Sequence, residues 1–235
     1  MKIILNITRV FLVSTVLFCT YKIMEKTSEY READIVYNHI REEKEKIENK
    51  KTEETLFDKY EDYRGWISIA NTNIDYPILQ STDNSYYLKR DINKDYLASG
   101  SIFMHYLNDN FNDKNTVIFG HYMKNDTMFG QLKQYKNKDF FKNNNEILIT
   151  TKDKILKYRV FSVYVTNAND PYIRTDFEDA NQYSQFLNTI TNKSLYKSDI
   201  TVNENDRILT LSTCSYEFKN ARLAIHAKLV ESTNI

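Results

Sequence analysis

The chain has 235 residues, enough for one domain of about 150 to 200 residues and an extension. Its 32 acidic and 32 basic residues balance, so no bulk charge indicates a nucleic acid or another polyanion as a partner. With 18 tyrosines but only 4 glycines and 2 prolines, the composition argues against a disordered or collagen-like chain.

An apolar segment lies near the N-terminus. Its uninterrupted part, residues 10–21, would form roughly 18 Å of helix, which is shorter than the ~30 Å hydrocarbon layer of a bilayer. Residues 3–24 would form about 33 Å of helix, provided that Arg9 and Lys22 extend toward the two interfaces. The longer segment is therefore long enough to span a membrane.

A cleaved signal peptide is the alternative for this segment. No small-x-small cleavage site follows it, and Phe18 directly before Cys19 does not suit a lipoprotein signal. Lys2 and Arg9 favour a cytoplasmic N-terminus. We therefore expect residues 1–24 to anchor the chain in the cell membrane with one span, and the rest of the chain to lie outside.

Residues 25–58 are rich in Glu, Lys and Arg and contain neither Gly nor Pro. A narrow stripe at helical three-to-four spacing predicts one or two helices here. The stripe consists of Tyr30, Ala33, Tyr37, Ile40, Lys44 and Ile47. A solvated stalk and a helical cap packed on the next domain both fit this pattern.

From residue 59 to 235 the pattern is that of a β domain. Short alternating apolar runs predict strands within residues 65–80, 99–107, 115–123, 146–166, 206–214 and 221–230. A short helix is expected over 126–135, with Asp126 as N-cap and Met128, Leu132 and Tyr135 on one face. A second helix is expected over 177–196, with Tyr183, Phe186, Leu187 and Ile190 as its buried stripe. Many strands with few helices predict an antiparallel-dominated β-barrel or sandwich.

The last two expected strands carry Cys214 and Arg222. Because side chains alternate along a strand, Leu211 and Leu223 facing the core would place Cys214 and Arg222 on the other, accessible face. The same alternation turns Thr210, Ser212, Ala224, His226 and Lys228 outward. A cation beside a thiol lowers the thiol pKa, and it also stabilises charge that develops on a carbonyl oxygen under attack.

Four histidines are candidates for a general acid or base. His39 lies in the charged helical stretch, where a solvated surface position is expected. His105 suits a packing role on a strand, and His226 suits a surface or supporting role. His121 follows the apolar run TVIFG at a strand end, where loops commonly carry catalytic groups.

Two motifs resemble the sortases, membrane-anchored cysteine transpeptidases of Gram-positive bacteria, and specifically class B. They are NTVIFGHYMKNDTMFGQL around His121 and ILTLSTCSYEF around Cys214, and a long helix-bearing insertion precedes the cysteine strand. The resemblance covers roughly residues 55–231. It implies a closed β-barrel of about eight strands with N-terminal helices and a helix inserted before the cysteine strand.

The resemblance also implies the chemistry. Cys214 would be the nucleophile, His121 the general acid/base and Arg222 the stabiliser of oxyanion or substrate. The enzyme would cleave a C-terminal sorting motif after threonine through a thioester and transfer the surface protein to an amine of a peptidoglycan precursor. No cofactor and no metal site is expected, since no C-x-x-C pair, H-E-x-x-H helix or compact acidic cluster occurs.

Six further residues are candidate substrate contacts. They are Thr213, Ser212, Tyr172, Ile173, Tyr196 and Ser198. Ordinary β-propensity also accounts for Thr213 and Ser212, and turn or packing roles also account for the other four.

Two other functions compete with a transpeptidase. A cysteine endopeptidase shares the Cys/His pair, but the papain-type layout places the Cys before the His and at a helix start. A non-catalytic, membrane-tethered binding domain would make Cys214 an incidental buried thiol.

Overall fold

The structure is a computed structural model that describes residues 2–50 and 55–235. Residues 51–54 of the expected charged segment 25–58 therefore lie outside the described residues. The helical elements are α1 (Lys2–Lys50), α2 (Leu56–Lys59), η1 (Tyr86–Lys89), η2 (Gly130–Lys136), α3 (Lys138–Asn143), η3 (Pro171–Ile173) and α4 (Ala180–Asn192). The strands are β1 (Tyr63–Ser68), β2 (Asp75–Leu79), β3 (Ile102–Met104), β4 (Asn115–Phe119), β5 (Glu146–Thr150), β6 (Lys154–Asn167), β7 (Ile208–Cys214) and β8 (Ala221–Asn234).

The strands close into one barrel in the order β1-β2-β3-β4-β7-β8-β6-β5. Of the two expected architectures, a β-barrel and a β-sandwich, the structure is therefore the barrel. Neighbours pair antiparallel except β2 with β3 and β4 with β7, which are parallel. The two longest strands, β6 and β8, pair along their length with register shifts at Lys157/Tyr158 and Val160/Ser162. Such bulges bend a strand and increase its twist, which helps a sheet to curl into a barrel.

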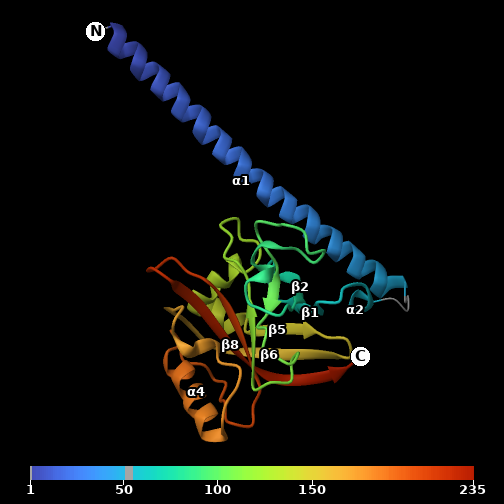
Figure 1. The fold of residues 1–235 in the computed structure, drawn as a ribbon. Helices are drawn as coiled ribbons and strands as arrows, with labels where there is room; N and C mark the ends of the chain where they lie inside the picture. The colour runs from blue at the N-terminus through green and yellow to red at the C-terminus, as the bar shows by residue number, and fades with distance from the viewer. Residues whose placement is uncertain (1, 51–54) are drawn as a thin grey trace.

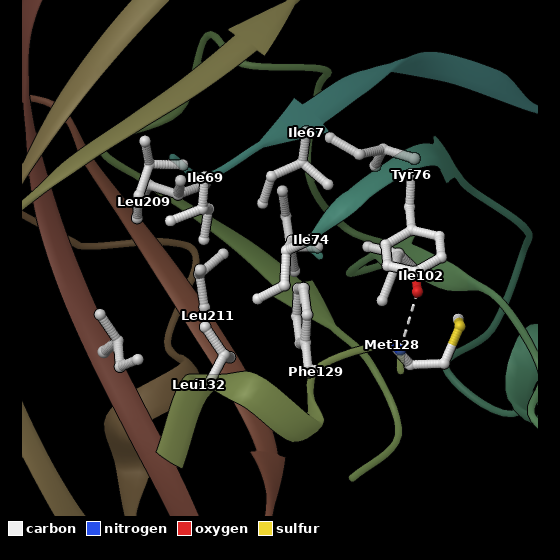
Figure 2. Packing of buried hydrophobic residues seen from close by; sticks show 14 of the residues in the cluster. Ile67, Ile69, Ile74, Tyr76, Ile102, Met128, Phe129, Leu132, Leu209 and Leu211 are labelled. Carbon is white, nitrogen blue, oxygen red and sulfur yellow. Dashed lines mark hydrogen bonds between the residues drawn. The ribbon is translucent and has the colours of Figure 1, made fainter. Parts of the chain in front are cut away.

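The barrel interior is filled by apolar side chains from most of its strands (Figure 2). Ile67, Ile118, Leu209, Leu211 and Ile225 are fully or almost fully buried there. Leu209 and Leu211 thus face the core as the alternation along β7 predicts, and this sets the side from which the side chains at the end of β7 project.

Helix α1 packs its second half against the barrel, and its first half projects away from it (Figure 1). Ala33, Tyr37 and Ile40 are buried, and the ammonium group of Lys44 lies 5.3 Å from the centre of the Trp66 ring. The helical stripe predicted from the sequence is therefore the face that contacts the barrel. Of the two expected arrangements, the helix packed on the domain is the one observed, and the solvated stalk is not. By length and composition, α1 also holds an 18-residue window that qualifies as a candidate membrane span, with mean hydropathy 1.5.

Helix α4 and η3 form a second layer outside the barrel, over β6, β7 and β8. Tyr172, Tyr183, Leu187, Phe161 and Ala224 pack together in this layer. The expectation of an accessible outer face is therefore wrong for most of it: Thr210, Ser212, Ala224 and His226 turn away from the interior but are buried. The reason is that the insertion before β7 folds back over the sheet, which alternation along a strand cannot reveal.

The segment after β4 also differs from the prediction. The expected helix over 126–135 is a 3-10 helix that begins at Gly130, and Asp126 is not its N-cap. Asp126 and Met128 have φ angles of 64° and 52°, so the chain turns through left-handed conformations before the helix starts. A side-chain carbon at Gly130 would collide with the Met123 carbonyl oxygen, which accounts for the glycine at this tight turn.

Candidate active site

Cys214 and Arg222 are held directly opposite each other on neighbouring strands. β7 and β8 pair antiparallel, and Cys214 is the register partner of Arg222 at the end of the ladder. Directly opposed residues of an antiparallel pair project from the same face, with Cβ atoms about 4.5–5.5 Å apart. Ser215 N–H donates to the Ala221 carbonyl at 3.0 Å and closes the loop just beyond this pair. Both side chains are partly exposed.

His121 reaches the same place from the other neighbour of β7. Phe119, at the end of β4, is the parallel register partner of Ser212, and Gly120 N–H donates to the Ser212 carbonyl at 3.2 Å. His121 follows Gly120 directly, so it leaves β4 beside the end of β7, where Cys214 lies. Cys214 thus lies between the chains that carry His121 and Arg222.

Gly120 makes this close approach possible. A side-chain carbon there would lie 2.7 Å from the Phe129 ring and would collide with Ile102. The glycine before His121 is therefore required for close packing rather than for a left-handed turn.

The ring of His121 is held by a main-chain group. Its Nε2 lies 2.7 Å from the carbonyl oxygen of Leu88, the third residue of η1. A carbonyl only accepts, so Nε2 carries the proton and donates it. In the neutral ring Nδ1 then has the free lone pair, and it has no hydrogen-bond partner among the described residues. This leaves Nδ1 available to exchange a proton with a reacting group.

The other histidines are unsuited to proton transfer at this site. His226 is fully buried, and burial lowers its pKa to about 3, so the ring is neutral. Its Nδ1 lies 2.9 Å from Thr210 Oγ1 and its Nε2 3.0 Å from the Tyr164 hydroxyl. The expectation of a surface position for His226 is wrong, because α4 covers it. His105 is a packing residue whose pKa is lowered by burial, and His39 is exposed, both as predicted.

Of the candidate substrate contacts, Tyr172 and Ser212 lie at this site. The Tyr172 hydroxyl lies 2.8 Å from Ser212 Oγ. Ser212 is two residues before Cys214 on β7, so it is the neighbour of Cys214 on the outer face of that strand. Burial raises the pKa of Tyr172, while Ser212 and the nearby charge of Arg222 act in the opposite direction. Thr213 is also buried, and its hydroxyl has no hydrogen-bond partner within residues 2–50 and 55–235.

A hollow of about 180 Å³ adjoins Tyr172 between η3 and α4. Pro171, Arg174, Phe186 and Lys193 are among its lining residues, and apolar surface predominates in it. Ile173 lies beside Tyr172 in η3 and packs on the cluster under α4. The lining thus combines two cations with the rings of Tyr164, Tyr172 and Phe186. A mostly apolar hollow with a few polar groups suits a side chain of an extended peptide.

Tyr196 and Ser198 contact other segments. The Tyr196 hydroxyl donates to the Lys136 carbonyl, and its ring packs on Phe141 at a centroid distance of 5.6 Å. Ser198 Oγ accepts a hydrogen bond from the Ile200 N–H at 3.1 Å. No hydrogen bond or ring contact among the described residues joins either side chain to Cys214, so their substrate role stays a prediction.

Two features of the site have no signal in the sequence. One is the Leu88 carbonyl, which lies 33 positions before His121. The other is Glu217 in the loop between β7 and β8, which accepts from Ser215 Oγ and forms an ion pair with Lys136 at 2.6 Å. Burial alone would raise the pKa of Glu217, but these two donors outweigh it and lower the pKa to about 2. The carboxylate thereby ties the loop after Cys214 to η2.

The chain is similar to known proteins over most of its length. The sortase domain family matches residues 67–230. Sortase B of Staphylococcus aureus is 34% identical over 240 residues, covering 98% of each protein. A solved structure of Clostridium perfringens sortase B is 44% identical with a TM-score of 0.71, covering 73% of this chain and 95% of that one. A Staphylococcus aureus sortase B–substrate complex is 33% identical with a TM-score of 0.79, covering 87% of this chain and 99% of that one.

Proposed function

This chain belongs to the sortase B family and is a sortase-type cysteine transpeptidase; on that premise we propose that Cys214, His121 and Arg222 carry its chemistry. Its substrates are surface proteins with a C-terminal sorting signal, which the enzyme cleaves after threonine. The acceptor is an amine of a peptidoglycan precursor. The observation that carries this proposal is the order β4-β7-β8, which sets Cys214 between the chains of His121 and Arg222.

The first half-reaction forms a thioester. The thiolate of Cys214 attacks the threonine carbonyl carbon, and the carbonyl oxygen becomes an oxyanion. The guanidinium of Arg222 faces that oxygen from the opposite strand, and one such donor contributes about 3–4 kcal/mol in studied enzymes. Protonated His121 gives a proton to the amine as the carbon–nitrogen bond breaks.

The second half-reaction releases the product. The acceptor amine attacks the thioester carbon, and neutral His121 removes the proton that the amine loses. Because the Leu88 carbonyl holds the proton of Nε2, Nδ1 is the nitrogen that alternates between the two states. Cys214 leaves as thiolate, and a new amide bond joins the surface protein to the wall precursor.

The same proposal includes the cellular arrangement. Residues 1–24 anchor the chain in the cell membrane with the N-terminus in the cytoplasm, residues 25–58 link the anchor to the enzyme, and residues 59–235 form the catalytic domain outside. The exposed apolar first half of α1 and the cations Lys2 and Arg9 support it. Protease treatment of intact cells tests it, since an uncut C-terminal domain contradicts this orientation.

The activity is tested with the purified full chain in detergent and a library of pentapeptides that contain threonine. Each reaction runs with and without an added amine, and mass spectrometry identifies the products. We expect the fragment ending in threonine to become joined to the amine. We also expect a mass increase of the enzyme by that acyl fragment, located on Cys214.

Two variants serve as controls. Cys214→Ala should form no acyl-enzyme, and His121→Ala should lose turnover, while both keep the wild-type circular dichroism spectrum. Hydrolysis that no amine affects would instead support the endopeptidase. An acyl-enzyme that persists in Cys214→Ala would remove Cys214 from the mechanism.

A further inference from the structure

A residue of α1 is hydrogen-bonded to the segment that packs against the Leu88 carbonyl group. The Tyr37 hydroxyl is buried and donates to the Gly100 carbonyl at 2.5 Å, and it lies 3.2 Å from Ser101 Oγ. Ser101 in turn uses its Oγ to donate to the Arg90 carbonyl at 2.7 Å. Tyr37 is thus bonded to the segment that packs directly against η1.

That segment sets the position of the Leu88 carbonyl. Ser101 N–H donates to the Tyr87 carbonyl at 2.9 Å. Gly100 has a φ angle of 56°, and a side-chain carbon there would collide with the Leu88 carbonyl oxygen. The main chain of Gly100 therefore lies against the same oxygen that accepts the proton of His121 Nε2, so that a shift of one displaces the other.

A second series of contacts connects Tyr37 to His121, and it begins at the ring of Tyr37. This ring packs edge-on against Tyr76 at a centroid distance of 5.1 Å. The Tyr76 hydroxyl accepts a hydrogen bond from the Met128 N–H at 3.0 Å, the dashed line in Figure 2. The next residue, Phe129, donates its N–H to the His121 carbonyl at 3.0 Å.

Both series of contacts start from Tyr37 on α1 and end at His121. The first ends at the carbonyl that accepts from the imidazole of His121, and the second ends at the main chain of His121. We propose that Tyr37 is a positioning residue for His121, and that the second half of α1 is a working part of the active site. This inference rests on the proposed role of His121. On this inference, α1 affects the turnover of the enzyme in addition to carrying the apolar N-terminal segment.

The test is Tyr37→Phe in the full chain, in detergent, with the best-cleaved pentapeptide of the library as substrate. This variant removes the hydroxyl and keeps the ring contact with Tyr76. We expect kcat to fall about 10-fold with KM within about 2-fold, since a misplaced catalytic group slows the chemical step more than it weakens binding. NMR of isotope-labelled histidine should show a smaller population of the Nε2-protonated ring at His121.

Tyr183→Phe is the matched control. Tyr183 is equally buried, and its hydroxyl lies 3.0 Å from the carbonyls of both Lys114 and Asp206, at the other end of β4 and β7. This variant should lose comparable stability in urea and keep wild-type kcat. Wild-type kcat in Tyr37→Phe, or equal kcat losses in both variants, would overturn the positioning role. Activity retained in His121→Ala would instead refute the proposed function, so the two failures are distinguishable.

Discussion

Cys214 at the end of β7 and Arg222 near the start of β8 are register partners across an antiparallel ladder. Only six residues, 215–220, connect the two strands, and a main-chain hydrogen bond closes this loop. The sheet itself therefore fixes these two main-chain positions opposite each other, and the Arg222 guanidinium donates from Nη1 to the Ala221 carbonyl at 3.0 Å. A donor held in this way loses little entropy when charge develops beside it.

Arg222→Lys tests the guanidinium. Lysine keeps the charge but not the planar pair of donors, so we expect kcat/KM to fall about 100-fold. The unfolding temperature should change little, because the side chain is partly exposed at a strand end. Steady-state kinetics and thermal unfolding measure the two effects. Arg159→Lys on β6, where Arg159 is also partly exposed, should leave both unchanged. Normal turnover in Arg222→Lys would exclude Arg222 from catalysis.

Thiol labelling tests whether Cys214 is accessible. The chain has two cysteines, so Cys19→Ser leaves Cys214 as the only thiol. Because Cys214 is partly exposed, we expect a methanethiosulfonate reagent to label the folded Cys19→Ser enzyme and to abolish turnover. The double variant with Cys214→Ala should take up no label. Labelling that requires unfolding would mean that the nucleophile is sealed from substrate.

Tyr172→Phe tests the role of the Tyr172 hydroxyl separately from the role of its ring. The variant leaves Ser212 Oγ without its buried partner, so we expect the free energy of unfolding to fall by about 1 kcal/mol. KM should change little, because the hydroxyl is engaged with Ser212. Tyr172→Ala also removes the ring that lines the hollow under α4, and KM should then rise about 10-fold, equivalent to about 1.4 kcal/mol. A large KM increase in Tyr172→Phe would show that the hydroxyl contacts substrate.

His226 predicts a pH dependence of stability. Its pKa is near 6.5 in the unfolded chain and is lowered to about 3 by burial in the folded one. Between these values the unfolded chain binds the extra proton, so the stabilisation is complete above about pH 6.5 and is lost as the pH falls toward 3. We expect a contribution of about 1.4 kcal/mol per pH unit in that window, measured by urea unfolding.

Two histidine variants isolate this contribution. His226→Gln should flatten the stability curve between about pH 6.5 and 4 by that slope, whatever its effect on absolute stability. His39→Gln should leave the slope unchanged, because His39 is exposed. The same slope in wild type and His226→Gln would mean that the buried ring is protonated in the folded protein.

The sequence alone determined the outline of this protein, and the comparisons agree with the family that its motifs indicated. Alternation along β7 and β8 turned Leu209, Leu211, Leu223 and Ile225 into the core. Three-to-four spacing identified the face of α1 that contacts the barrel. These features depend on the geometry of single elements, and periodicity reports such geometry directly.

Only the tertiary structure decided which groups meet. The parallel pairing of β4 with β7 brings the chain that leads into His121 beside the end of β7, although 92 residues separate His121 from Cys214 in the sequence, and no local pattern encodes that register. Folding of α4 over the barrel turned the expected outer surface around His226 into a second core. The contact of His121 with the Leu88 carbonyl and that of Tyr37 with the Gly100 carbonyl join side chains to distant main-chain groups, and the side-chain pattern of a sequence does not reveal such contacts. Local preference shapes each strand and helix, but closure of the barrel sets the distances on which the chemistry depends.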